Sequence, residues 1–250
     1  MSVLSLRRET QWKRADFPAT HWSTVLTAGE EESSRVSGAL ERICEKYWYP
    51  LYAFVRRKGY PHAEAQDLTQ QFLLHLLEKN SIRRARQERG KFRSFLLTSL
   101  NHFLADDWKR QSAQKRGGGQ VISLDGLAEA EMRFQQEDGG EMRPDKAFEK
   151  AWAMTLLEKA MIRLRREWAE DGKETLFDLL KEFILAGPNL PPYRHLGGKC
   201  RMTEGALKMA VCRMRRQFRE ILCDEMGQTV EHPGEIEEEI RYFIKVMTEG

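Results

Sequence analysis

The 250-residue sequence lacks the patterns on which membrane, exported and metal-binding proteins depend. No run approaches the ~20 apolar residues that a membrane-spanning helix needs. The first residues, MSVLSLRRETQWKR, lack the apolar segment of a signal peptide, so we expect a cytoplasmic protein. The cysteines form no Cys-x-x-Cys pair, and His195 with Cys200 is too little for a zinc site. We therefore expect reduced thiols, no metal and no membrane contact.

Motifs of the common enzyme classes are also missing. The glycine run at 117–120, GGGQ, lacks the Lys-Ser/Thr that a phosphate-binding loop requires, and no His-Glu-x-x-His motif occurs. No nucleophile stands beside an obvious general base. We expect no enzyme activity and no cofactor.

The net charge of +3 conceals a segregation of charge along the chain. Two blocks have a net charge of +7: residues 83–116 carry 10 basic and 3 acidic side chains, and residues 193–219 carry 8 and 1. Two other blocks are acidic, with −5 over residues 120–149 and −6 over residues 224–250. Basic blocks of this kind favour binding to nucleic acid, and a purely helical scaffold would not predict them.

Strand alternation is absent, and the apolar periodicity predicts helices throughout. They are expected over 18–28, 39–58 (kinked or divided by Pro50), 63–78, 92–111, 147–168, 173–185 and 235–247. Glycines at 117–119 and 139–140, together with surplus acid, predict a flexible linker.

The sequence thus predicts an all-α protein with two helical modules joined by an acidic flexible linker. Its expected parts are an N-terminal extension (1–38), a first module (39–116), the linker (117–146), a second module (147–223) and an acidic C-terminal tail helix (224–250). The stretch 168–190 is expected to add a helix to the second module.

The stretch 202–219, MTEGALKMAVCRMRRQFR, predicts one amphipathic helix with Thr203 as its N-cap. Its apolar face is expected to hold Ala206, Leu207, Ala210, Val211, Met214 and Phe218, and its cationic face Lys208, Cys212, Arg216 and Arg219, with Met209 and Arg215 flanking. Gly205 lies in the middle of the cationic face, although glycine costs ~0.8–1.0 kcal/mol in a helix relative to alanine. A missing side chain there would let the backbone approach a phosphate or a base edge.

A short helical start at 193–196 and a turn precede this helix. Short helix, turn and cationic helix form the pattern of a helix-turn-helix, whose second helix enters the major groove of DNA. The alternative is an ordinary solvated basic face.

Aromatic and basic residues interleave over 83–116. The helix expected from Phe92 should bury Phe92, Leu96, Leu100, Phe103 and Leu104, and expose Ser94, Thr98, Asn101, His102, Ala105 and Lys109, with Trp108 at the margin. A solvent-exposed face that carries hydrogen-bonding groups, an aromatic ring and a cationic end suits single-stranded nucleic acid, because bases stack on aromatic rings. The alternative is ordinary helix packing in which arginine stems cover apolar surface.

Three stretches carry a family resemblance: ALERICEKYWYPLYAFVRRKGYPHAEAQDLTQQFLLHLLEKN, then FRSFLLTSLNHFLADDWKRQSAQKR, then YRHLGGKCRMTEGALKMAVCRMRRQFREIL. In this order they resemble the signatures of a bacterial RNA polymerase sigma factor of the extracytoplasmic-function (ECF) type, over about 40–116 and 147–223. The resemblance implies a sigma region-two-like helical bundle and a region-four-like helix-turn-helix. It also implies promoter recognition, DNA melting and transcription initiation, without chemistry of the chain's own.

The resemblance assigns three sets of residues. The stretch Asp67-Leu68-Thr69-Gln70 looks like the start of the family's polymerase-docking helix, which implies contacts from Asp67, Gln70, Gln71, Leu74 and Glu78, although a surface leucine without a role is the alternative. The DNA-melting set is Asn101, His102, Trp108, Lys109, Arg110, Lys115 and Arg116, in which Asp106 and Lys109 match the family's Asp and Arg and either Asn101 or His102 takes the place of its Asn. In the second module Lys208, Met209, Cys212 and Arg213 align with the family's major-groove positions, and the helical pattern adds the rest of the major-groove set, Thr203, Gly205 and Arg216.

The partners implied are core RNA polymerase, through its clamp coiled coil and flap, double- and single-stranded promoter DNA, and an anti-sigma protein, with a free protein that is monomeric. We also hypothesise that the acidic tail helix folds back on a basic surface and restrains DNA binding. The rival function is a helix-turn-helix regulator that binds DNA without acting as a polymerase subunit.

Overall fold

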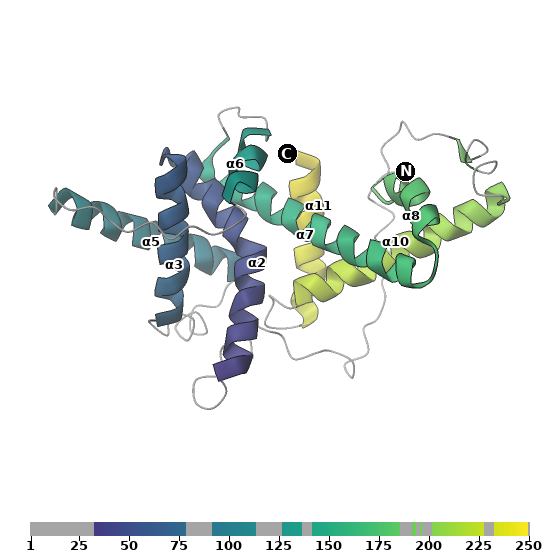
Figure 1. The fold of residues 1–250 in the computed structure, drawn as a ribbon, viewed down its shortest axis with the longest axis horizontal. Helices are drawn as coiled ribbons and strands as arrows, with labels where there is room; N and C mark the ends of the chain where they lie inside the picture. Colours follow the sequence, from purple (N-terminus) through teal and green to yellow (C-terminus); the bar gives the residue numbers. More distant parts are fainter. Residues whose placement is uncertain are drawn as a thin grey trace. The chain divides into compact units, whose positions relative to one another are not determined.

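The computed structural model describes residues 33–78, 92–113, 127–136, 142–185, 192–193, 196, 202–227 and 233–249. All regular elements within these residues are helices, so the all-α prediction is confirmed (Figure 1). None of the helices in this part of the chain has the length and apolar character to cross a bilayer. The helix expected over 18–28 lies outside the described residues.

The chain divides into two compact units, and the division falls within α7 (Pro144–Glu170), between Thr155 and Leu156. The expected second module began at 147, so the contacts assign the first part of α7 to the earlier unit. The first unit otherwise holds α2 (Ser33–Arg57), α3 (His62–Glu78), α5 (Phe92–Ala113) and α6 (Leu127–Gln136). The second unit adds α8 (Glu174–Leu180), η2 (Lys181–Phe183), α10 (Glu204–Gly227), η3 (Pro233–Glu235) and α11 (Ile236–Glu249).

In the first unit, α2 is longer than the sequence predicts. It begins at Ser33 rather than at 39, and Pro50 lies inside it without dividing it. Two residues beyond the end of the helix, Gly59 has a positive φ of +96°, a conformation that glycine adopts without the strain of a side chain. The core that α2, α3 and α5 share includes the buried side chains of Tyr47, Leu51, Tyr52, Phe54, Phe72, Leu96 and Leu100.

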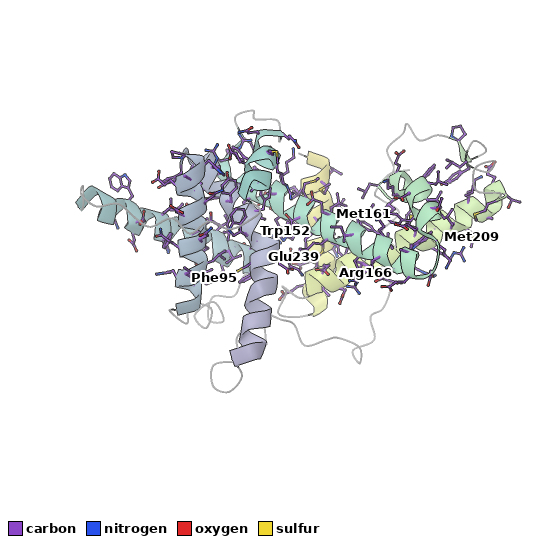
Figure 2. The ribbon with its side chains drawn as sticks, viewed as in Figure 1. Phe95, Trp152, Met161, Arg166, Met209 and Glu239 are labelled. Carbon is purple, nitrogen blue, oxygen red and sulfur yellow. The ribbon has the colours of Figure 1, made fainter. Side chains whose placement is uncertain are left out.

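Two further elements complete the first unit. The prediction of a flexible linker over 117–146 is wrong for Leu127–Gln136. These residues form α6, which packs on α2. The first part of α7 contributes Phe148, whose ring stacks 6.4 Å from that of Tyr47. It also contributes Trp152, labelled in Figure 2, whose ring lies 5.0 Å from the guanidinium of Arg93. This unit is therefore larger than the bundle that the sequence predicts.

In the second unit, polar contacts join α7 to α10. Trp168 Nε1 donates to Gln217 Oε1 at 2.9 Å, and Gln217 Nε2 donates to Glu167 Oε2 at 3.0 Å. Arg163 of α7 forms an ion pair with Asp224 of α10. The helix expected from 173 is confirmed as α8 and η2, and the Phe177 ring packs against Trp168 with 6.4 Å between centroids.

The C-terminal helix α11 belongs to the same unit. The helix expected over 235–247 is confirmed, and its apolar stripe of Ile236, Ile240 and Phe243 is buried. Arg219 of α10 donates to Glu237 of α11, with 2.9 Å between Nη2 and Oε1. The tail thus folds back on one basic side chain, as we expected.

Candidate nucleic-acid and polymerase interfaces

The first turn of α10 is built as the sequence predicts. Thr203 is the N-cap, because the amide N–H of Ala206 donates to Thr203 Oγ1 at 3.2 Å. A Cβ added at Gly205 would meet nothing within 4 Å. Since the glycine makes no room for any neighbour in the described structure, its backbone is open to a partner from outside the chain.

The two faces of α10 are confirmed except at Ala206, which is only half-buried, and at Arg219, which contacts the tail. Leu207, Ala210, Val211, Met214 and Phe218 are buried, whereas all seven residues of the major-groove set are exposed: Thr203, Gly205, Lys208, Met209, Cys212, Arg213 and Arg216. Met209 is 63% exposed, which is unusual for a methionine, and it projects from α10 (Figure 2). The helix therefore presents a continuous cationic surface with one apolar side chain on it.

Two arginines of the same helix face the protein instead. Arg215 Nε donates to the carbonyl oxygen of Phe183 at 2.9 Å, and Arg219, expected on the cationic face, pairs with Glu237. The tail therefore touches α10 beyond the major-groove set. The described part of α11 leaves the seven residues of the major-groove set exposed, and the restraint of DNA binding by the tail stays a prediction.

Lys208 is oriented by two neighbours. Its Nζ lies 2.6 Å from Glu204 Oε1, and it stands 5.9 Å from the centroid of the Tyr193 ring. The hydrogen bond that Lys208 donates to Glu204 raises the pKa of Lys208, so the ammonium stays charged at physiological pH. Of the short helix expected at 193–196, only Tyr193 and Leu196 are described, and both are helical. The turn between that helix and α10 lies outside the described residues.

The exposed face of α5 matches the one expected for single-stranded nucleic acid. Phe92, Leu96, Leu100, Phe103 and Leu104 are buried, and the exposed residues are Ser94, Thr98, Asn101, His102, Ala105, Trp108 and Lys109. Trp108 is 67% exposed, so most of its ring is open to a stacking partner.

Within that face, the polar side chains contact their own helix. Asn101 Nδ2 donates to the Leu97 carbonyl oxygen at 3.0 Å, and Lys109 Nζ lies 3.5 Å from Asp106 Oδ1. His102 is exposed beside Asn101. Arg110 belongs to α5 but its side chain, like Lys115 and Arg116 altogether, lies outside the described residues.

The polymerase-docking set lies on α3. Gln71 and Leu74 are exposed, with Leu74 at 55%, and Asp67 and Gln70 are half-buried beside them. Phe72 and Leu76 are buried on the opposite face, as the helical spacing predicts. The Glu78 side chain lies outside the described residues. An exposed leucine flanked by amides and a carboxylate suits a partner helix better than a polyanion.

One cluster in the first unit has no counterpart in the sequence prediction. Glu131 of α6 accepts hydrogen bonds from the Tyr52 hydroxyl and from Arg56, whose Nε and Nη2 lie 3.1 and 3.0 Å from its two oxygens. Burial favours the protonated acid, but the donors Tyr52 and Arg56 outweigh it and lower the pKa of Glu131. Burial and the bond to Glu131 raise the pKa of Tyr52, so the phenol stays protonated.

His62 completes this cluster. Its Nδ1 lies 2.7 Å from the Tyr52 hydroxyl, and its Nε2 lies 3.0 Å from Gln66 Nε2. A neutral imidazole that donates from Nδ1 and accepts at Nε2 satisfies both contacts. The apolar spacing of Leu127, Ala130 and Phe134 was a signal for α6, but the flanking glycines outweighed it. No group of three or more His, Cys, Asp and Glu side chains with metal-site geometry occurs in the described segments.

Comparison with known proteins gives one match. Residues 44–114 match the family model described as Sigma-70 region 2. The matched residues run from α2 to the end of α5 and contain the whole docking set of α3. No curated protein and no solved structure matches the chain. The match shows similarity to Sigma-70 region 2 over 71 of the 250 residues.

Proposed function

We propose that the chain is a promoter-specificity subunit of RNA polymerase of the ECF type. The observation that carries this proposal is the Sigma-70 region 2 match over residues 44–114, and the exposure of Leu74 and Trp108 on the same unit supports it. The resemblance of 193–222 to the family's second DNA-binding element extends the proposal to the second unit. The protein performs no chemistry itself.

In this proposal α3 docks on the clamp coiled coil of polymerase. Leu74 supplies an apolar contact, and Asp67, Gln70, Gln71 and Glu78 surround it with polar groups that orient the partner helix. Leu74 is 55% exposed, and covering its side chain with a partner helix would remove apolar surface from water. This burial would provide the driving force for docking.

The exposed face of α5 binds the strand that opens. Asn101 or His102 contacts an unstacked base, Trp108 stacks on it, and Lys109, Arg110, Lys115 and Arg116 neutralise phosphates. Removing a base from the duplex costs a few kcal/mol, which stacking on an aromatic ring at ~1–3 kcal/mol per base offsets.

The second unit reads the duplex through α10. Gly205 brings the helix start close to the DNA backbone, Lys208 and Met209 reach base edges, and Arg213 and Arg216 contact phosphates. The short helix near Tyr193 takes the position of the first helix of a helix-turn-helix. The polymerase flap is the second docking site for this unit, and an anti-sigma protein is a candidate regulator.

Transcription in vitro with core RNA polymerase and genomic templates tests the proposal. We expect the purified chain to direct initiation from a defined subset of templates, and Leu74→Arg to abolish it. Core polymerase that initiates equally with and without the chain would contradict the proposal.

The second candidate function is a helix-turn-helix regulator that never binds polymerase. The exposed cationic face of α10 supports it independently of the region 2 match. Co-purification with core polymerase at moderate salt separates the two, because only a polymerase subunit is retained.

A further inference from the structure

The contact between α6 and α2 has the chemistry of a nucleic-acid site. The Arg56 guanidinium holds the Glu131 carboxylate through two nitrogens, at 3.1 and 3.0 Å. The planar fork of arginine binds a phosphate with the same two-pronged geometry. The side chains of Arg56 and Glu131 are 20% and 17% exposed, so the pair is largely shielded from water.

The second half of the contact is built around the ring of Phe134. The Phe134 ring lies 4.8 Å from the guanidinium of Arg56 and 4.8 Å from that of Arg57, and it meets the Tyr52 ring edge-on at 6.3 Å. Two guanidinium groups and a tyrosine around one flat ring form the environment in which proteins stack an unpaired base. In α6 the acid precedes the aromatic residue by three positions, which brings both onto one face of the helix.

The charges on the two sides of this contact also agree with a nucleic-acid site. The helix α6 carries Glu129, Glu131 and Arg133, a net charge of −1, within the acidic segment 120–149, whereas the last turn of α2 holds Arg56 and Arg57 and is followed by Lys58. α6 lies against this part of α2 (Figure 1). The helix α6 lies outside residues 44–114, so the family match does not account for α6.

We propose that Tyr52, Arg56 and Arg57 form a binding site for single-stranded nucleic acid, which α6 occupies as an internal mimic. Glu131 takes the place of a phosphate and Phe134 that of a base. This site is separate from the exposed face of α5. Because α6 belongs to the same chain, nucleic acid enters only when α6 leaves. The apparent affinity is therefore the affinity of the open site multiplied by the fraction of molecules in which α6 is released.

Release of α6 tests the proposal. The double variant Glu131→Gln/Phe134→Ala removes the charge and the ring, and Gln136→Ala, at an exposed position of the same helix, is the matched control. Hydrogen exchange of residues 127–136 reports whether α6 has left, and a thermal melt reports whether the unit stays folded. The probe is a labelled 12-nucleotide oligo-dT in moderate salt, with Trp108→Ala in every protein to reduce binding by α5.

We expect exchange within α6 to rise in the double variant and oligo-dT to bind on the order of tenfold more tightly, within the usual range of coupling between competing ligands. Adding Arg57→Gln to the double variant should abolish the gain. Equal affinity of the released and control proteins overturns the proposal, and so does a gain that survives Arg57→Gln.

A peptide of residues 125–138 added in trans separates the two kinds of occupant. If the released variant binds the peptide but shows no gain for oligo-dT, the site is specific for an acidic helix and the proposal is wrong. If the peptide displaces oligo-dT from the released variant, both occupy one site, as we expect. None of these outcomes depends on polymerase, so failure of the proposed function leaves this test unaffected.

Discussion

Arg219 of α10 and Glu237 of α11 form an ion pair with 2.9 Å between Nη2 and Oε1, at a point on α10 beyond the residues of the major-groove set. The acidic tail is therefore a packing element of the second unit. Its buried residues Ile236, Ile240 and Phe243 contribute more than the ion pair, since a partly exposed pair contributes ~1 kcal/mol or less.

The first prediction concerns this packing. Phe243→Ala should lower the free energy of unfolding of the second unit by ~3–5 kcal/mol, because it removes a buried ring and leaves a cavity. Affinity for promoter DNA in the folded protein should not change. Urea unfolding and a binding isotherm on the same samples check both, with exposed Lys245→Ala as the control. Tighter DNA binding without loss of stability would favour a restraining tail instead.

The second prediction separates phosphate contacts on α10 from general charge. Arg213→Gln and Arg216→Gln should each weaken promoter binding and reduce the slope of log K against log salt by ~1. Arg166→Gln removes the same charge from an exposed position on α7 and should leave the slope unchanged (Figure 2). Binding measured from low to moderate salt provides the slopes. Equal losses in all three variants would indicate only a general electrostatic effect.

The third prediction concerns stacking on α5. Trp108→Ala should weaken binding to single-stranded promoter DNA by ~1–3 kcal/mol, and Trp108→Phe should recover part of the loss. Fluorescence anisotropy with the strand that opens measures it. Ile162→Ala, at an exposed apolar residue of the second unit, is the control for surface hydrophobicity. If Trp108→Ala and Ile162→Ala bind equally well, α5 does not stack on bases.

The sequence predicted the features that depend on a single helix and missed those that depend on contacts between distant segments. The faces of α5 and α10 were predicted residue by residue, since a helix fixes which side chains share a face, and Leu96 and Met214 are buried as expected. The helix α6 was missed because glycines and surplus acid around it predict a linker, and because ten residues form a marginal helix without distant partners such as Arg56. The pairing of Arg219 with Glu237 likewise depends on a fold-back that periodicity does not encode.

The fourth prediction tests the docking face of α3. Leu74→Arg should reduce binding to core polymerase by at least tenfold without changing the melting temperature, because Leu74 is 55% exposed and supports no core. Met132→Arg is the control, since Met132 on α6 is equally exposed at 56%. Pull-down with core polymerase and a thermal melt measure the two effects. If both variants lost binding to core polymerase equally, the loss would be caused by the added positive charge rather than by damage to the docking face.

The fifth prediction uses the cysteines as reporters. Burial raises the pKa of the Cys223 thiol to about 11, so at pH 8 only about one molecule in a thousand carries the reactive thiolate. Cys212 is exposed on the cationic face of α10. Iodoacetamide at pH 8, followed by peptide mass spectrometry, should therefore modify Cys212 rapidly and Cys223 only after unfolding.

Promoter DNA should protect Cys212 from this modification, because the proposed geometry places that face in the major groove, where the reagent has no access. Cys44 provides the internal control, since it lies half-buried on α2 and burial raises the pKa of its thiol as well. Its modification should be slow and independent of DNA. Equal modification of Cys212 with and without saturating promoter DNA would show that α10 binds elsewhere or in another orientation. Rapid modification of Cys223 in the folded protein would show that the contact between α10 and α11 opens readily, and that the tail is less firmly packed than its buried stripe implies.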